Sequence, residues 1–425
     1  MTAPSAPSTP PALSAALQGL DAIHEDLAGF YRDLHRHPEL SFEEERTAGR
    51  IAERAAAYGY TVTSGVGRTG VVAVLENGDG PTVLLRADID ALPVKEQTEL
   101  PYASATDGVM HACGHDMHVT CLLGALKLLA DARADWHGKV IGVFQPAEEV
   151  GGGAQAMVDD GLFDRFGRPD VVLGQHVAPL PAGLIGCHKG PAFAATDALL
   201  VRMFGKGGHG SRPEATVDPV VMAASTVMRL QTVVSREVAG GETAVVTVGA
   251  LNAGTKDNII PDEAELRINI RTYTPEVRTR VLAAVERIVR GEAVVAGAHR
   301  EPEFSVIDSF PVVVNDGAAV DRTMAAIGGA LGAGKVLDPG PVTGSEDVGI
   351  LATAAQVPLC YWLFGGADPA AVAAAQAAGT FEKDIPSNHS PHFAPQVGPT
   401  LTTGVTALTA AALEWLGAAR DGAGG

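Results

Sequence analysis

Short apolar runs alternate with helical stretches through the first 180 residues, and this alternation constrains the fold more than any other feature. The runs TVLLR (82–86), KVIGVF (139–144) and DVVLG (170–174) have strand composition. Between them, TCLLGALKLLADA (120–132) and GGGAQAMVDDG (151–161) have helical patterns. Apolar strands that alternate with helices predict an α/β fold, with a mixed, mainly parallel sheet flanked by helices on both faces.

Polar residues follow these predicted strands at the point where each strand ends. Asp88 and Asp90 follow TVLLR, Glu148 and Glu149 follow KVIGVF, and His176 follows DVVLG. In open α/β sheets, ligands and catalytic groups gather at the carboxyl ends of the strands. We therefore expect several strands to deliver carboxylates and imidazoles to one edge of the sheet.

A change of pattern divides the chain, which at 425 residues is too long for one ordinary core. Residues 195–303 show clearer alternation of polar and apolar side chains, with helical stretches between them, which predicts an inserted α+β satellite domain. The catalytic domain is then discontinuous and comprises residues 21–194 and 304–420. Residues 1–20 are expected to form a flexible tail.

The charge and cysteine content restrict the partners and the compartment. Lys and Arg number 31 against 50 Asp and Glu, giving a formal net charge of −19, and such a surface repels nucleic-acid phosphates. No run of 18 apolar residues occurs, so no membrane span is expected. Residues 1–16 lack the basic and apolar regions of a secretory signal. The four cysteines show no CxxC pairing, which favours a reducing cytoplasm.

The segment MHACGHDMH (110–118) is the strongest chemical signal. It places Cys113 and His115 close together, and a thiolate with an imidazole suits soft-to-borderline metals. A polar turn with unrelated histidines is the alternative for this segment by itself. Glu149, His176 and His389 extend the candidate ligands to five, and this number suits a pair of divalent ions about 3.5–4 Å apart. Manganese, zinc, cobalt and nickel all fit such a mixed site.

Glu148 and Glu149 are neighbours in the sequence. Adjacent side chains of an extended segment point to opposite sides. Glu149 can therefore bind metal while Glu148 acts as general base and then general acid. An ordinary acidic turn is the alternative interpretation of this pair.

Together these motifs resemble the metal-dependent N-acyl-amino-acid amidohydrolases, a family that includes hippurate hydrolase, aminoacylases and indole-acetyl-amino-acid hydrolases. The resemblance runs from about residue 20 to about residue 416. The segments that carry it are HPELSFEE, RADIDALP, MHACGHDMHVT, FQPAEEVGGGAQAMV, GQHV, GKGGHGSRP, NIIPDEAELRINIRTY and NHSPHF. It implies a zinc-exopeptidase-like catalytic domain with an inserted lid or dimerisation domain.

The resemblance also implies roles for individual residues. The metal ligands would be Cys113, His115, Glu149, His176 and His389, with the Cys113 thiolate near or between two divalent ions. Glu148 would be the catalytic base and acid, and Asp90 would orient a ligand. Asp88 matches the first acid of the family's strand-end pair, where relatives in the larger superfamily carry a ligating histidine nearby.

The satellite domain carries the remaining implied roles. His209 in the glycine-rich loop GKGGHGSRP would reach the active site of a partner subunit and help to hold the substrate or its oxyanion. Asn258 would contact the scissile carbonyl, and Arg271 would bind the substrate carboxylate, which a guanidinium matches well. The implied assembly is a homodimer, with a tetramer as the alternative.

The sequence therefore predicts hydrolysis of the amide bond of a small N-acylated amino acid by a two-metal site. A dipeptidase or N-carbamoyl-amino-acid hydrolase with the same site is the first alternative. A binding module without catalysis is the second. A hydrolase that uses Cys113 as its nucleophile is the third.

Overall fold

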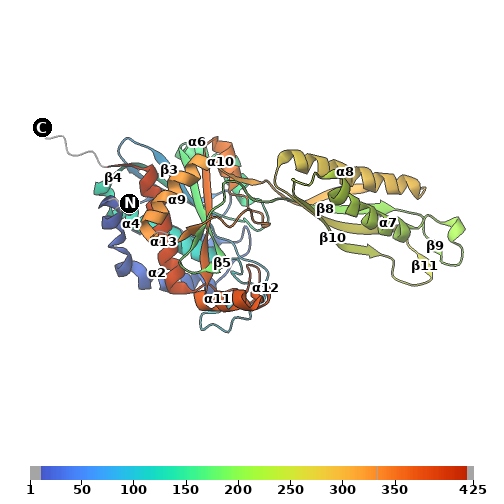
Figure 1. The fold of residues 1–425 in the computed structure, drawn as a ribbon, viewed down its shortest axis with the longest axis horizontal. Coiled ribbons are helices and arrows are strands. Elements are labelled where there is room, and N and C mark those ends of the chain that lie inside the picture. The colour runs from blue at the N-terminus through green and yellow to red at the C-terminus, as the bar shows by residue number, and fades with distance from the viewer. Residues whose placement is uncertain (1–10, 333, 419–425) are drawn as a thin grey trace, which may run out of the picture. The chain divides into compact units, whose positions relative to one another are not determined.

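The computed structural model describes residues 11–332 and 334–418 (Figure 1). The chain divides into two compact units. Unit 1 comprises the described residues of Met1–Gly190, Val314–Gly340 and Asp347–Gly425, and unit 2 comprises Pro191–Val313 and Pro341–Glu346. Among the helices that can be described, none combines the length and the apolar character needed to cross a membrane.

Unit 1 is built on a mixed sheet with the strand order β1-β2-β4-β3-β5-β16-β6-β15, and β17 pairs with β4. The central neighbours β4, β3, β5 and β16 run parallel, whereas β1, β2 and β17 add antiparallel pairs. The strands are β1 (Thr61–Val66), β2 (Gly70–Asn77), β3 (Thr82–Asp88), β4 (Trp136–Gln145), β5 (Val171–Pro181), β6 (Ile185–Gly186), β15 (Val336–Leu337), β16 (Leu359–Ala367) and β17 (Gly417–Ala418). Two short strands, β7 (Gly190–Phe193) and β14 (Val313–Asn315), lie where the chain passes between the units.

The helices of unit 1 cover this sheet, and α4 and α13 are its most buried helices. An added Cβ at Gly124 of α4 would lie 2.7 Å from Val405 of α13 and 2.9 Å from Leu27 of α2, so only a glycine permits this close packing. The helices are α1 (Pro11–Leu17), α2 (Leu20–Arg36), α3 (Glu45–Ala57), α4 (His115–Asp131), α5 (Gly153–Asp159), α6 (Leu162–Phe166), α9 (Gly317–Leu331), α10 (Gly349–Ala355), α11 (Pro369–Ala378), α12 (Phe381–Asp384) and α13 (Val397–Trp415). A 3₁₀ turn, η1 (Arg133–Asp135), follows α4.

Unit 2 is a four-stranded antiparallel sheet in the order β10-β12-β8-β13, with two long helices packed on it. Asp218 and Thr274 cap the two helices by accepting backbone N–H bonds, and each helix begins with a proline. The elements are β8 (Ala195–Phe204), β9 (Gly208–His209), η2 (Pro213–Ala215), α7 (Pro219–Thr232), the π-helical turn η3 (Val233–Glu237), β10 (Ala244–Ala253), β11 (Ile259–Ile260), β12 (Glu263–Thr272), α8 (Pro275–Val295) and β13 (Glu303–Phe310).

The mixed, mainly parallel sheet with flanking helices and the additional antiparallel sheet confirm the predicted fold class. The expected satellite, residues 195–303, falls within the longer segment Pro191–Val313 of unit 2. The structure of residues 11–20 differs from the flexible tail predicted for residues 1–20. Residues 1–10 lie outside the described residues, but α1 forms a helix and Leu13 is only 3% exposed. Burial of this side chain in the core of unit 1 explains why the segment is structured.

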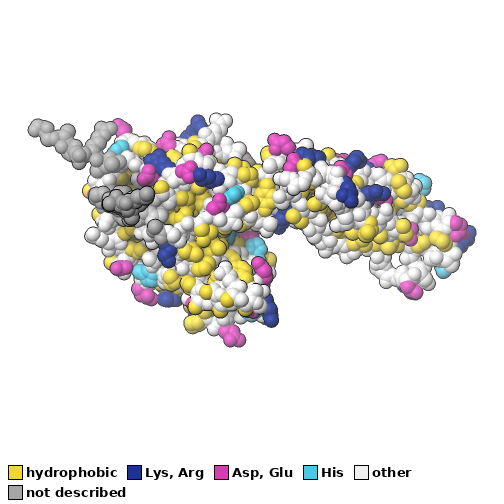
Figure 2. All heavy atoms as spheres, in the orientation of Figure 1, with side chains coloured by type: hydrophobic (Ala, Val, Ile, Leu, Met, Phe, Trp, Pro, Cys, Tyr) yellow, Lys and Arg dark blue, Asp and Glu magenta, His cyan; other side chains and the backbone are white. Residues whose placement is uncertain are grey.

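Basic side chains of unit 2 stand beside acidic ones (Figure 2). Arg280 bonds Glu242, and Arg287 bonds Glu237. Paired in this way, these arginines do not form a free basic stripe of the kind that tracks a nucleic-acid backbone.

Candidate functional site

The site in unit 1 lies at the carboxyl edge of the parallel strands. In the sheet register, Asp88 of β3 pairs with Gln145 of β4, and Arg86 of β3 pairs with Gly174 of β5. The strands therefore end at the same edge, as the sequence pattern predicts. The polar side chains gathered there are Asp88, Asp90, Glu148, Glu149 and His176.

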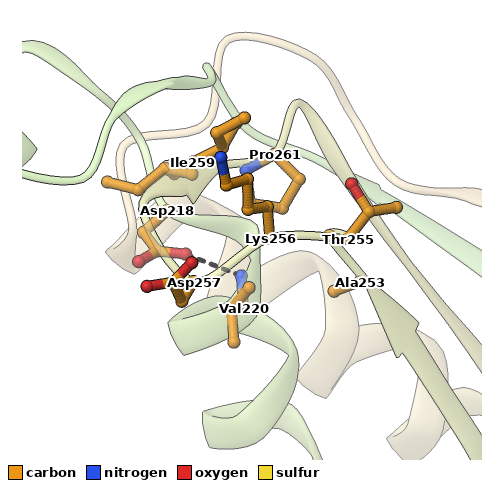
Figure 3. A pocket seen from close by; sticks show the side chains of 10 residues that line it. Asp218, Val220, Ala253, Thr255, Lys256, Asp257, Ile259 and Pro261 are labelled. Carbon is orange, nitrogen blue, oxygen red and sulfur yellow. Dashed lines mark hydrogen bonds between the residues drawn. The ribbon is translucent and has the colours of Figure 1, made fainter.

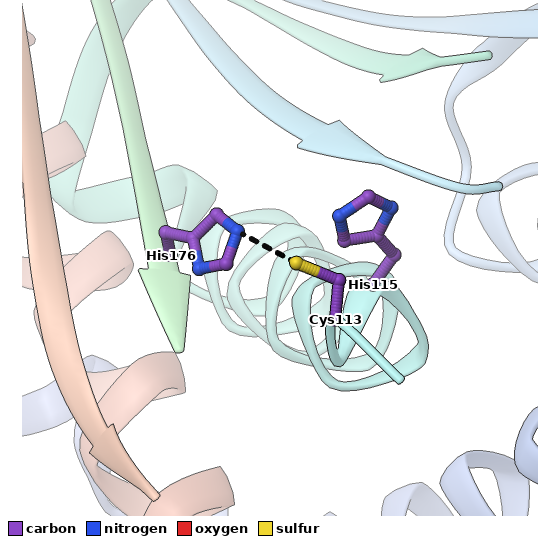
Figure 4. A group of neighbouring side chains, drawn as sticks. All are labelled: Cys113, His115 and His176. Carbon is purple, nitrogen blue, oxygen red and sulfur yellow. Dashed lines mark hydrogen bonds between the residues drawn. The ribbon is translucent and has the colours of Figure 1, made fainter. Parts of the chain in front are cut away.

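Cys113, His115 and His176 form the centre of the site (Figure 4). The Cys113 Sγ lies 3.5 Å from His176 Nε2, and one ligand atom from each of the three residues lies within 4.8 Å of the others. Gly114 makes this approach possible. Its φ of +82° is left-handed, and an added Cβ would lie 2.4 Å from Val177.

Glu149 and His389 complete the predicted set of five. His389 Nε2 lies 3.4 Å from Glu149 Oε2, and both residues group with Cys113 within 4.8 Å. His389 has a left-handed backbone with φ of 69°, and its N–H donates to the Ala112 carbonyl at 2.8 Å. Asn388 donates to the Cys113 carbonyl at 3.1 Å. These bonds tie the distant NHSPHF segment to the thiol-bearing turn.

Two buried atoms indicate that this donor set fits a cation. In the described part of the chain, His115 Nε2 and Glu149 Oε1 have no hydrogen-bond partner. They lie 3.7 Å apart, which is too far for a hydrogen bond. Zinc takes nitrogen and oxygen ligands at about 2.0–2.2 Å, so two such ligands of one ion lie at a comparable separation. An unpaired buried carboxylate oxygen is costly, and a divalent ion would remove this cost.

Burial and the surrounding carboxylates set the protonation of the donors. Burial alone would lower the pKa of His115, but Asp88 and Asp90 outweigh it and raise this pKa to about 10. Burial lowers the pKa of His176 to about 4, so its imidazole is neutral at pH 7. Burial, reinforced by nearby carboxylates, raises the pKa of the Cys113 thiol. A raised pKa disfavours Cys113 as a free nucleophile, whereas a coordinated cation stabilises its thiolate.

Asp90 occupies the position that an orienting role requires. Its Oδ1 lies 3.2 Å from His115 Nδ1, so the opposite ring nitrogen of His115 faces the other donors. Its Oδ2 accepts bonds from the Ser41 hydroxyl at 2.7 Å and from the Glu149 backbone N–H at 3.0 Å. One carboxylate thus fixes a candidate ligand ring and the main chain of a second candidate ligand.

Glu148 lies beside the cluster and is 5% exposed. Its Oε2 is 4.0 Å from His115 Nε2. The preceding residue, Ala147, has a left-handed φ of 48°, which is a strained conformation for a residue with a Cβ. The buried Glu44 accepts the Ala147 N–H at 2.9 Å and the Thr69 hydroxyl at 2.5 Å. These bonds hold the turn from which Glu148 and Glu149 both reach His115, so that one oxygen of each carboxylate lies within 4.8 Å of the other and of that ring.

The three predicted satellite residues lie in unit 2. His209 on β9 pairs with β11, and the neighbouring Gly210 N–H donates to the Asn258 carbonyl at 2.9 Å, so His209 and Asn258 lie in adjoining segments. Both are exposed. Arg271 lies on β12, where its guanidinium donates to the Thr343 carbonyl.

Unit 2 also has a surface pocket of about 470 Å³ (Figure 3). Its lining includes Asp257 and Ile259, the two residues on either side of Asn258 in the sequence. Lys256 and Asp257 supply charged groups, and Asp218 accepts the Val220 N–H at 2.8 Å. The pocket is lined by Asp218, Val220, Ala253, Gly254, Thr255, Lys256, Asp257, Ile259, Ile260 and Pro261. Asn258 lies between two of these residues in the chain but is not part of the lining.

Several buried polar residues that support the site were not assigned a role from the sequence. Arg86 donates to Asp88 at 2.7 Å and to Gln145 at 2.9 Å. His118 contacts Asp88 at 2.5 Å. Its spacing from His115 is a signal that could have been used, because residues at i and i+3 share a helix face. Arg86 gave no comparable signal, since a charged residue inside an apolar run is normally exposed.

A buried network behind the cluster gives a testable pH dependence. His35 Nδ1 lies 2.7 Å from Asp116 Oδ2, and His35 Nε2 lies 3.3 Å from Glu96 Oε1. Burial alone would lower the pKa of His35, but these two carboxylates outweigh it and raise the pKa to about 9. Burial would raise the pKa of Glu96, but the bond with His35 helps to lower it to about 2.

Because the folded pKa of His35 lies above its ordinary value, its contribution to stability is complete below about pH 6.5 and is lost as the pH rises through about 9. The Glu96 contribution is complete above its ordinary pKa of 4.5 and is lost as the pH falls towards 2. We expect the free energy of unfolding of the chelated parent to fall between pH 6 and pH 9.5 by roughly 3 kcal/mol more than that of chelated His35→Gln. Urea unfolding at the two pH values measures this difference. The exposed His299→Gln control should follow the parent. Equal losses in the parent and His35→Gln would contradict this assignment.

The fold and the donor set define a metal-dependent hydrolase of the exopeptidase-like class. Comparison with known proteins agrees with this class. The chain belongs to peptidase family M20/M25/M40, whose model matches residues 84–387.

The alignments with individual relatives cover most of this chain and most of each relative. The chain is 39% identical over 308 residues to the N-acetylcysteine deacetylase of Bacillus subtilis, covering 72% of this chain and 80% of the relative. It is 41% identical over 290 residues to the hippurate hydrolase of Campylobacter jejuni, covering 68% and 74%. Among solved structures, the Bacillus subtilis YXEP protein, described as a dinuclear metal-binding peptidase, superposes with a TM-score of 0.74 at 31% identity, covering 93% and 99%.

Proposed function

We propose that this protein is a metal-dependent amidohydrolase that releases a carboxylic acid and a free amino acid from small N-acylated amino acids. The observation that carries the proposal is the unpaired His115 Nε2 facing the unpaired Glu149 Oε1, 3.7 Å away, with Glu148 beside them. The family and the activities named for its relatives support the same chemistry.

The residues that would hold two divalent cations are Cys113, His115, Glu149, His176 and His389. When bound, such cations polarise the amide carbonyl and lower the pKa of water. The identity of the metal is open among manganese, zinc, cobalt and nickel, because thiolate, imidazole and carboxylate ligands suit all four.

Glu148 would supply the proton transfers. Its carboxylate takes a proton from the attacking water, the new C–O bond forms, and the same proton goes to the leaving nitrogen as the C–N bond breaks. His209 and Asn258 would stabilise the oxyanion, and Arg271 would bind the substrate carboxylate. Since these three residues lie in unit 2, we also propose that this unit serves as a lid and dimerisation domain. The assembly would be a homodimer, with a tetramer as the alternative, acting in the cytoplasm.

A substrate panel tests this proposal. We expect amine release from N-acetyl and N-benzoyl amino acids, and much slower release from dipeptides and N-carbamoyl amino acids. Faster cleavage of a dipeptide or a carbamoyl compound would favour the dipeptidase or carbamoylase alternative. Tight binding of these compounds without release of any amine would contradict the proposal and favour a non-catalytic binding module.

A further inference from the structure

His118 is the third histidine of the thiol-bearing segment, and it lies one helical turn after His115 on α4. Its ring is buried, with 1% of the side chain exposed. It stacks on the His115 ring with a centroid separation of 5.3 Å and meets the His176 ring edgewise at 4.5 Å. It therefore packs against the rings of two candidate metal ligands.

The two ring nitrogens of His118 have different partners, and these partners fix its tautomer. The Val177 backbone N–H donates to His118 Nε2 at 2.7 Å, so this nitrogen carries no proton. The other nitrogen, Nδ1, lies 2.5 Å from Asp88 Oδ1 and donates its proton to that carboxylate. The second oxygen of Asp88 accepts from the buried Arg86 guanidinium at 2.7 Å.

This arrangement excludes His118 as a metal ligand as the site is built. Asp88, His115 and His118 have the spacing of a cation site. The Nε2 lone pair of His118, however, accepts the Val177 N–H, and Nδ1 is protonated. A cation could bind this ring only if one of these buried bonds were broken, and the partner group were left unsatisfied.

The bond to Val177 bears directly on His176. The pairing of β3 with β5 ends at Arg86 and Gly174, so on this side of β5 the Val177 N–H is accepted by His118 and not by a residue of β3. The Val177 carbonyl lies 2.7 Å from His176 Nδ1 and accepts its proton. The lone pair of His176 is therefore on Nε2, the atom that faces the Cys113 sulfur at 3.5 Å.

We propose that His118 is a positioning residue that, anchored by Asp88, holds the main chain of Val177 and thereby aims His176 at the metal site. This inference rests on the metal-binding part of the proposed function and is independent of the substrate. It also gives Asp88 a role as the anchor of His118 rather than as a ligand. Outer hydrogen-bond partners of this kind typically change metal affinity by 10–100-fold when they are removed.

Two matched substitutions separate the two bonds of His118. In His118→Gln the amide oxygen takes the place of Nε2 and can accept the Val177 N–H. In His118→Asn the amide nitrogen takes the place of Nδ1 and can reach Asp88, but the bond to Val177 is lost. Cys121→Ala, a buried change on the same helix, controls for general destabilisation.

Calorimetric titration with Co²⁺ and the visible spectrum of the bound Co²⁺ give readouts that do not depend on turnover. We expect all variants to bind as many ions as the parent. His118→Asn should bind at least one of them 10–100-fold more weakly with an altered spectrum, whereas His118→Gln and Cys121→Ala should stay within about threefold. Three results would overturn the inference: loss of one bound Co²⁺ ion in both His118 variants, equally weakened Co²⁺ binding in both, or unchanged Co²⁺ affinity in both. If the parent binds no Co²⁺, the proposed metal site fails and this inference fails with it.

A measurement on the unmutated protein does not depend on the folding of any variant. Histidine-selective ¹⁵N NMR, with the His118 ring identified by its through-space contact with the Val177 backbone N–H, should show that this imidazole remains the neutral Nδ1–H tautomer before and after Zn²⁺ is added. A Zn²⁺-dependent shift of the His118 signal to a metal-bound position would overturn the inference.

Discussion

Replacing Glu148 by Gln is expected to reduce amine release by at least 10²–10⁴-fold, the usual contribution of a positioned general base. The amide keeps the shape of the side chain but cannot accept a proton at neutral pH. Because Glu148 Oε2 lies 4.0 Å from the His115 nitrogen and Glu149 lies closer, the metal content should not change. The measurement pairs single-substrate turnover with elemental analysis of the purified variant.

The neighbouring carboxylate provides the matched control for this experiment. Glu149→Gln removes the charge of a carboxylate whose Oε2 lies 3.4 Å from His389 and whose Oε1 lies 3.7 Å from His115, so this variant should lose both metal and turnover. A Glu148→Gln enzyme that keeps its rate within about tenfold of the parent would show that another group moves the proton. A Glu148→Gln enzyme that loses its metal would instead make Glu148 a ligand.

Removal of divalent metal is expected to abolish turnover and to lower the thermal midpoint. The buried thiol, carboxylate and imidazoles then face one another without a compensating charge, which destabilises the folded state. A site occupied at 100 times its Kd contributes about 2.7 kcal/mol to stability, so the shift in midpoint should be measurable by calorimetry. Added zinc, manganese, cobalt or nickel should restore both the turnover and the midpoint.

A chelator that has been saturated with nickel beforehand cannot readily take up zinc, manganese or cobalt, so it controls for non-specific effects and should change neither quantity. Activity that survives full chelation, measured with elemental analysis of the same sample, would contradict the metal-dependent mechanism. Complete inactivation by a thiol alkylator together with such survival would revive Cys113 as the nucleophile.

Much of the architecture could be predicted from the sequence because its causes are local. The apolar runs that become β3, β4 and β5 are hydrophobic almost throughout, as strands buried on both faces must be. Parallel neighbours end at one edge, so Asp88, Glu149 and His176 could be assigned to a common edge before their distances were known. The helical structure of residues 11–17, in the segment expected to be a tail, could not be predicted from local causes. Its helix α1 is short, and it is held by the burial of Leu13 in a core formed by distant segments.

The sequence by itself determined the fold class, the family resemblance and a set of candidate ligands that all lie in one cluster. Only the tertiary structure distinguished the histidines of MHACGHDMH by the partners of their ring nitrogens. His115 and His118 share a helix face, but one has an unpaired nitrogen and the other has both nitrogens occupied, by Asp88 and by Val177. Those two partners lie 30 and 59 residues away from His118, and hydrogen bonds over such separations arise from strand packing, which no local pattern encodes.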